Sequence, residues 1–89
     1  MKIYILKTLC DIHNNYGGID DVRVSAYTDL KKAQDHMKEF FNTTKNYFIE
    51  DEHFPEQNLD MHYEDYLCYI NNNVDYYSAE IVEDYLEVE

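Results

Sequence analysis

The fold is decided by residues 22–48, VRVSAYTDLKKAQDHMKEFFNTTKNYF, where strand periodicity gives way to helix periodicity. Over residues 21–27, valine and alanine alternate with polar side chains, which predicts a β-strand with one apolar face. Thr28 or Asp29 then supplies an N-cap, and apolar residues recur at spacings of three and four, which predicts an amphipathic helix over residues 29–46. The members of this apolar stripe are Leu30, Ala33, Met37, Phe40, Phe41, Thr44 and Phe48.

The residues before this stretch predict a second strand and a turn. Residues 2–10 carry β-branched, aromatic and leucine side chains on both faces, which indicates a central strand of a sheet. Residues 11–20 are dense in turn formers, including Gly17 and Gly18. We therefore expect a β-hairpin with a long tip before the helix.

The residues after the helix allow two interpretations. Residues 50–56 predict a loop, and the apolar positions that follow fit a helix begun at Pro55 or Glu56. A strand over residues 66–70 fits the same positions.

The last element is also ambiguous between strand and helix. Tyr77, Ala79 and Ile81 alternate as in a strand, after which the apolar phase changes. A β-bulge would reset that phase, whereas a helix capped by Ser78 would use the later apolar residues. We expect the strand.

These elements predict a single α+β domain over residues 1–89. Its architecture is an antiparallel sheet with one long amphipathic helix packed on one face, in the order ββα(α)β. The opening strand, residues 26–33 and the Tyr-rich, Glu-rich end resemble small uncharacterised bacterial and phage proteins that share such a beginning and ending. The resemblance rests on fold residues and carries no catalytic motif, so it implies this architecture and little about activity.

Charge is distributed very unevenly along the chain. The formal net charge is −12, yet residues 1–49 hold all seven Lys and Arg with six acids, and residues 50–89 hold thirteen acids and no Lys or Arg. Direct binding to nucleic acid or to an anionic membrane is disfavoured, because both need clustered bases. The natural complement of the acidic half, residues 50–89, is a basic protein surface.

Tyrosine is concentrated in the same part of the chain. Seven of the ten tyrosines lie at or after Tyr47. Tyrosine rings attract arginine through cation–π contacts, so an acidic surface with tyrosines suits an Arg-rich partner. We expect Tyr66 in the core, and Tyr69, Tyr76 and Tyr85, which alternate with acids, at the surface.

No sequence motif indicates an enzyme, a cofactor or a metal site. Phosphate-binding, hydrolase, zinc-protease and EF-hand motifs are absent, and the histidines fit no compact zinc spacing. Cys10 and Cys68 permit one disulfide, but a lone pair of cysteines without a secretory signal favours two reduced thiols. The expected location is the cytoplasm of a bacterial host cell.

The sequence therefore predicts a non-enzymatic protein-binding inhibitor. Its acidic, Tyr-containing surface would mimic nucleic acid and block the basic groove of a nucleic-acid-binding protein. In size, acidity and lack of catalytic motifs the chain is similar in type to small phage inhibitors of bacterial defence, including some anti-CRISPR proteins. The alternative is a small interaction or homodimerising domain whose acidity only provides solubility. The candidate partner-binding residues are Glu50, Asp51, Glu52, Glu56, Asp60, Glu64, Asp65, Tyr69, Asp75, Tyr76, Glu80, Glu83, Asp84, Tyr85 and Glu87.

Overall fold

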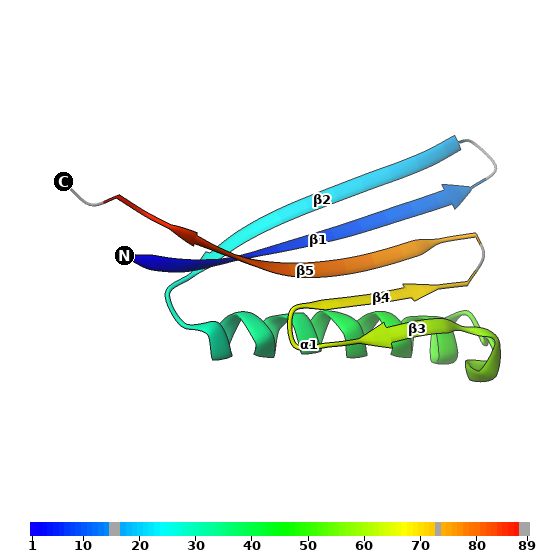
Figure 1. Cartoon of the computed structure of the whole chain (residues 1–89). Coiled ribbons are helices and arrows are strands. Elements are labelled where there is room, and N and C mark those ends of the chain that lie inside the picture. Colours follow the sequence, from blue (N-terminus) through cyan, green and yellow to red (C-terminus); the bar gives the residue numbers. More distant parts are fainter. Residues whose placement is uncertain (15–16, 73, 88–89) are drawn as a thin grey trace.

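The computed structural model describes residues 1–14, 17–72 and 74–87, and shows a five-stranded antiparallel sheet with one long helix (Figure 1). The strand order across the sheet is β2-β1-β5-β4-β3, so the last strand in the chain lies in the middle. The α+β class and the order ββα(α)β are confirmed. The elements are β1 (Lys2–Asn14), β2 (Gly17–Tyr27), α1 (Leu30–Asn46), its π-helical extension η1 (Tyr47–Asp51), a 3-10 turn η2 (Glu56–Asn58), β3 (Asp60–Tyr63), β4 (Leu67–Asn71) and β5 (Tyr76–Tyr85).

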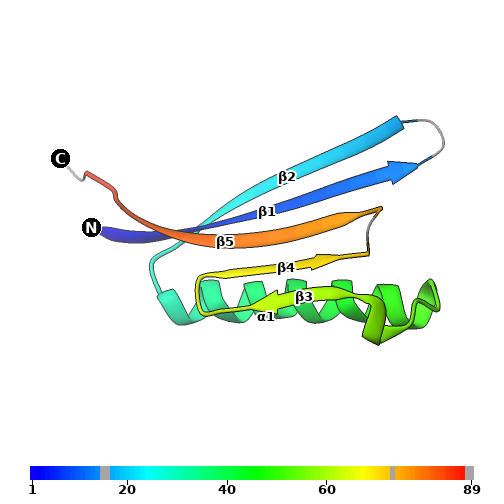
Figure 2. The ribbon, with the colours of Figure 1, turned by 45° about the vertical axis from the view of Figure 1, so that its right-hand side comes forward.

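The molecule has two layers, because α1 packs on one face of the sheet only. The helix packs against β5, β1 and β4, and Figures 1 and 2 show β1 and β2 diverging from it toward the Asn14 end of β1. Among the described residues, no helix or strand covers the opposite face of the sheet. We call that uncovered side the open sheet face.

The predicted helical stripe forms the core of the domain. Ala33 and Met37 are fully buried against the sheet, and Asp29 provides the cap by accepting a hydrogen bond from the Lys31 N–H at 2.9 Å. Burial of this apolar stripe supplies the main driving force for packing the helix on the sheet. The core consists of two clusters of buried side chains. The first cluster contains Leu6, Ala33, Met37, Cys68, Ala79 and Ile81, and the second contains Phe48, Leu59 and Ile70.

The helix does not stop where its regular stripe ends. After Asn46 the chain continues for one wider π-helical turn, and this turn carries Phe48 into the second cluster with no exposed surface. The extension thus closes the end of the core where the chain turns back toward β3.

The helical interpretation of the segment after Pro55 is wrong. The only helical residues there in the described chain are Glu56–Asn58, and β3 and β4 follow as an antiparallel pair. The strand alternative is confirmed for β4, and the expected final strand is confirmed as β5.

The first hairpin also differs from the expectation. Strand pairing continues from Tyr4 opposite Tyr27 as far as Asn14 opposite Gly17. The expected long tip is wrong, because most of its turn-forming residues lie in the two strands. The remaining tip, residues 15–16, lies outside the described residues.

The two cysteines are free thiols, as expected. Cys68 is completely buried in the first cluster, and burial raises its pKa to about 11. Burial also raises the pKa of the half-buried Cys10. Because the folded pKa of Cys68 exceeds its ordinary value of 9.0, the stability that its neutral thiol provides is complete below pH 9 and is lost as pH rises toward 11.

Alkylation with iodoacetamide at pH 8 is expected to distinguish these thiols. Cys10 should react at least about tenfold faster than Cys68 in the folded protein, because alkylation needs an accessible thiolate. Peptide mass spectrometry measures both rates in one sample. In guanidinium the two rates should become similar, and equal rates in the folded protein would contradict the burial of Cys68.

Candidate protein-binding surface

The open sheet face is defined by strand alternation and register. Leu6, Cys68 and Ala79 are buried beneath α1, so their neighbours along each strand point to the other side. The described side chains on the open sheet face are therefore Ile3, Ile5, Lys7, Leu9 and Asp11 of β1, Val22, Val24 and Ala26 of β2, Asp60 and His62 of β3, Leu67, Tyr69 and Asn71 of β4, and Tyr76, Ser78, Glu80, Val82 and Asp84 of β5.

Three aromatic rings stack across this face. The His62 and Tyr69 rings are 5.6 Å apart and 24° from parallel, and the Tyr69 and Tyr76 rings are 6.1 Å apart and 22° from parallel. His62 lies directly opposite Tyr69, whereas Tyr76 is the diagonal neighbour on β5. We call His62, Tyr69 and Tyr76 the ring ladder, which gives the face a rigid aromatic ridge.

A shallow hollow of about 250 Å³ adjoins the end of the ring ladder. Tyr76 provides its aromatic wall, and Glu80 and Ser78 provide a carboxylate and a hydroxyl. Lys7 of β1 lies directly opposite Glu80 in the register, and among the described residues it is the only Lys or Arg on this face. The remaining lining residues are Leu9 and Leu67.

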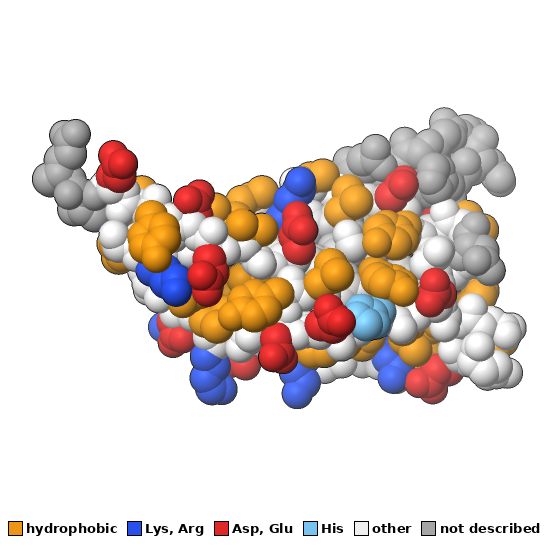
Figure 3. Space-filling model, viewed as in Figure 1, with side chains coloured by type: hydrophobic (Ala, Val, Ile, Leu, Met, Phe, Trp, Pro, Cys, Tyr) orange, Lys and Arg blue, Asp and Glu red, His pale blue; other side chains and the backbone are white. Residues whose placement is uncertain are grey.

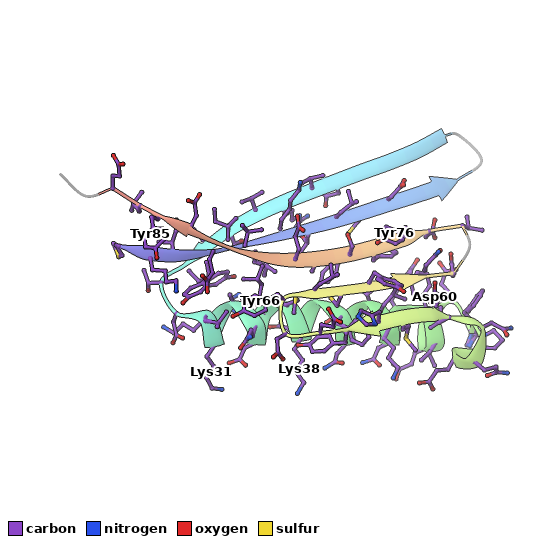
Figure 4. All side chains as sticks on the ribbon, in the orientation of Figure 1. Lys31, Lys38, Asp60, Tyr66, Tyr76 and Tyr85 are labelled. Atoms are coloured by element: carbon purple, nitrogen blue, oxygen red, sulfur yellow. The ribbon has the colours of Figure 1, made fainter. Side chains whose placement is uncertain are left out.

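The acids on the open sheet face are separated by apolar side chains. Figure 3 shows single acidic side chains among hydrophobic ones, with no continuous acidic area on the side it displays. Asp60 and Tyr76 lie toward the same end of the sheet in Figure 4, and Tyr85 lies at the other end of β5. Of the fifteen predicted residues, the structure brings five onto this face: Asp60, Tyr69, Tyr76, Glu80 and Asp84.

The other ten predicted residues lie outside the strand positions of this face, although the Glu64 carboxylate reaches it and lies 3.1 Å from His62 Nε2. The helix ends with Glu50, Asp51 and Glu52, and the 3-10 turn starts with Glu56. The turns beside β4 contain Glu64, Asp65 and Asp75. On the helix side of β5 or beyond it lie Glu83, Tyr85 and Glu87.

Several of these acids are paired within the chain. The Lys45 ammonium lies 3.0 Å from Glu56, and the Lys2 ammonium lies 3.4 Å from Glu83, whose hydrogen bond raises the pKa of Lys2. Lysines from residues 1–49 thus pair with some of the acids of residues 50–89. Lys31 and Lys38, in contrast, point away from the sheet on the outer side of α1, so they do not pair with the acids of the open sheet face (Figure 4).

The tyrosines only partly follow the expectation. Tyr85 is 71% exposed, as expected, but Tyr66 is 42% exposed, so its expected place in the core is wrong. Tyr66 precedes β4 in a turn, where no helix directs its ring inward. Tyr69 and Tyr76 are half-buried, because each packs against another ring.

The helix side carries a larger open groove of about 550 Å³ between α1 and the first hairpin. Leu6, Phe40 and Tyr77 give it apolar walls, and the Tyr27 hydroxyl hydrogen-bonds His36 Nδ1 at its side. Burial raises the pKa of Tyr77 to about 12, so this phenol stays neutral under ordinary conditions. Across residues 1–14, 17–72 and 74–87, no group of three or more His, Cys, Asp or Glu side chains is arranged to hold a metal ion.

Comparison with known proteins gives no relative. No protein-family model matches the chain, and neither a curated protein nor a solved structure is similar enough to count as a match. Within the described part of the chain, no helix has both the length and the apolar character needed to cross a lipid bilayer.

Sequence reasoning missed two contributors to the open sheet face. His62 is not among the predicted binding residues, yet it begins the ring ladder. Lys7 is not among them either, yet it lies opposite Glu80. Both roles depend on strand register, although the spacing of seven residues between His62, Tyr69 and Tyr76 was visible.

Proposed function

We propose that the protein is a non-enzymatic inhibitor that binds the basic surface of a nucleic-acid-binding protein. The observation that carries the proposal is that Asp60, Glu80 and Asp84 share one uncovered sheet face with the ring ladder. An uncovered face with ordered rings and carboxylates is typical of a protein-binding surface.

The hollow beside Tyr76 suits an arginine side chain of the partner. A guanidinium group placed there would lie against the Tyr76 ring and within reach of the Glu80 carboxylate. Arginine combines cation–π contact with charge-assisted hydrogen bonds, so one side chain can use both walls. Lys7 competes for the same carboxylate, which favours a partner that brings more than one base.

Binding of this kind would exclude nucleic acid from the partner. Grooves that bind phosphates present Arg and Lys, and carboxylates fixed on a sheet are anions that such a groove can bind instead. The proposed activity is therefore inhibition by occupancy, of the anti-defence type that the size and acidity of the chain resemble. The sheet fixes the backbone positions of the three acids, so binding has to order only their side chains.

Two matched charge-reversal variants test the proposal. The first carries Asp60→Lys, Glu80→Lys and Asp84→Lys on the open sheet face, and the second carries Glu50→Lys, Asp51→Lys and Glu52→Lys at the end of the helix. Both triple variants change the net charge of −12 equally. Each immobilised variant is used to capture proteins from a bacterial lysate, with elution by rising salt and with added DNA as competitor.

The open-face variant is expected to bind the salt-eluted partner at least about 100-fold more weakly than the unmodified protein, because three ion pairs become repulsive. The helix-end variant should retain binding. Lys7→Glu should strengthen binding, since it removes the competing base. Equal losses in both triple variants, or a captured protein that neither salt nor DNA releases, would contradict the proposal.

A further inference from the structure

The β2 strand forms a long edge of the sheet that no described element covers. Residues from Val22 to Ala26 are exposed without interruption, with Val22 51% and Val24 64% exposed. An edge strand presents unpaired backbone N–H and C=O groups to solvent, which makes it a template for another strand.

Proline, lysine and β-bulges, which often protect such an edge, are absent from residues 21–27. This segment contains no proline and no lysine, and its pairing with β1 continues residue by residue without a bulge. The opposite edge, β3, has only four residues. The two edges therefore differ, and only β2 offers eleven residues for pairing.

We infer that two copies of the chain pair through their β2 strands, antiparallel, about a twofold axis at Val22. Val22 is the midpoint of Gly17–Tyr27, so this register pairs the whole strand with its copy. Each residue of one copy then faces the residue of the other copy that lies the same number of positions from Val22 in the opposite direction along the chain. The occupant of the edge is thus a second copy of this chain.

Charge complementarity supports the same register. In one chain, Arg23 Nε lies 3.1 Å from Asp21 Oδ2, and the two side chains are 79% and 47% exposed. Pairing about Val22 places Asp21 of each copy directly opposite Arg23 of the other, which gives two cross-strand ion pairs. Opposite charges at directly facing positions stabilise antiparallel pairs, and like charges destabilise them.

The position of the edge also reduces repulsion between two chains of charge −12. β1 separates β2 from β5, β4 and β3, the three strands that belong to residues 50–89. Two strand spacings are about 10 Å, longer than the roughly 8 Å Debye length at physiological ionic strength. The Tyr27–His36 contact with the helix lies at the C-terminal end of β2, and Figures 1 and 2 show the rest of β2 extending away from the helix.

Reciprocal charge reversals test the pairing by sedimentation equilibrium at micromolar to millimolar concentrations. The unmodified protein is expected to form a dimer of twice 10.8 kDa. Arg23→Asp places acid opposite acid, and Asp21→Arg places base opposite base, so each variant alone should associate at least about tenfold more weakly. Mixed at equal amounts, the two variants should form a heterodimer, because every facing pair is then attractive.

Circular dichroism should show that both variants fold, because an exposed ion pair contributes little to stability. A monomer up to millimolar concentration would overturn the inference. A dimer that neither reversal weakens, or two variants that do not associate when mixed, would overturn it as well.

Cysteine cross-linking tests the register independently, in a Cys10→Ser background. With oxidised glutathione, Val22→Cys is expected to give a disulfide-linked dimer, because the two introduced thiols face each other at the axis. Val24→Cys is the matched control and should cross-link at least about tenfold more slowly, since it faces residue 20 of the other copy. Faster cross-linking of Val24→Cys would overturn the inferred register.

Discussion

Phe48→Ala is expected to lower the free energy of unfolding by about 3–5 kcal/mol. The Phe48 side chain has no exposed surface and packs with Leu59 and Ile70, so its removal leaves a cavity in the second cluster. A domain of this size has about 5–10 kcal/mol of stability in total. The variant should therefore be largely unfolded at low denaturant concentrations, as measured by urea titration with circular dichroism.

Tyr47→Ala is the matched control, because it removes the neighbouring aromatic side chain. Tyr47 is 41% exposed, and its hydroxyl donates a hydrogen bond to Glu52 at 2.6 Å. Its removal should cost about 1 kcal/mol. Similar losses in the two variants would mean that the π-helical turn does not bury Phe48.

Ala79→Asp is expected to be the most damaging single substitution on the sheet. Ala79 is 1% exposed in the central strand, between Cys68 of β4 and Thr8 of β1 and on the side covered by α1. An uncompensated carboxylate there should cost about 3–5 kcal/mol at pH 7. Burial raises the pKa of such a carboxyl group, so the loss should become smaller as pH falls and the group is protonated.

Ser78→Asp provides the control one residue away. Ser78 lies on the open sheet face, where a carboxylate remains in contact with water, so the change in unfolding free energy should stay within about 0.5 kcal/mol. Thermal unfolding at pH 7 and pH 5 measures both variants. A loss of stability in Ser78→Asp equal to that in Ala79→Asp would show that the assignment of the two faces is wrong.

The helix and the first hairpin were predictable because their periodicity is local. The stripe from Leu30 to Phe48 fits only a helix, and a cap residue stands directly before it. The hairpin tip was misjudged because turn-forming residues also occur within paired strands when the partner strand continues. The residue types predicted a hairpin, whereas the length of its two strands depends on how far the pairing continues.

The segment containing β3 and β4 could not be assigned from spacing. Leu59, Tyr63 and Tyr66 are three or four residues apart and fit one face of a helix. In the structure, a turn between the strands resets the alternation, and Met61 and Ile70 meet on the helix side. Tertiary packing decided between two local patterns of similar strength.

Which residues lie together on the candidate surface could be predicted even less well from the sequence. The sequence identified the acidic half as one feature, but strand alternation sends neighbouring acids to opposite faces, as with Glu83 and Asp84. Which acids share a face depends on the insertion of β5 between β1 and β4. That insertion is a property of the whole topology, which no local pattern encodes.

The late position of β5 in the chain also has a consequence for how the protein folds. The strand pairs Leu6 with Ile81, which are 75 residues apart, so joining the two parts of the sheet requires closure of a very long loop. Because the entropy of such closure must be lost before the contacts form, chains with this topology fold more slowly than helical bundles of similar size. During synthesis, the hairpin and the helix emerge before their central strand exists, so the apolar side of the helix stays incompletely covered until β5 has left the ribosome.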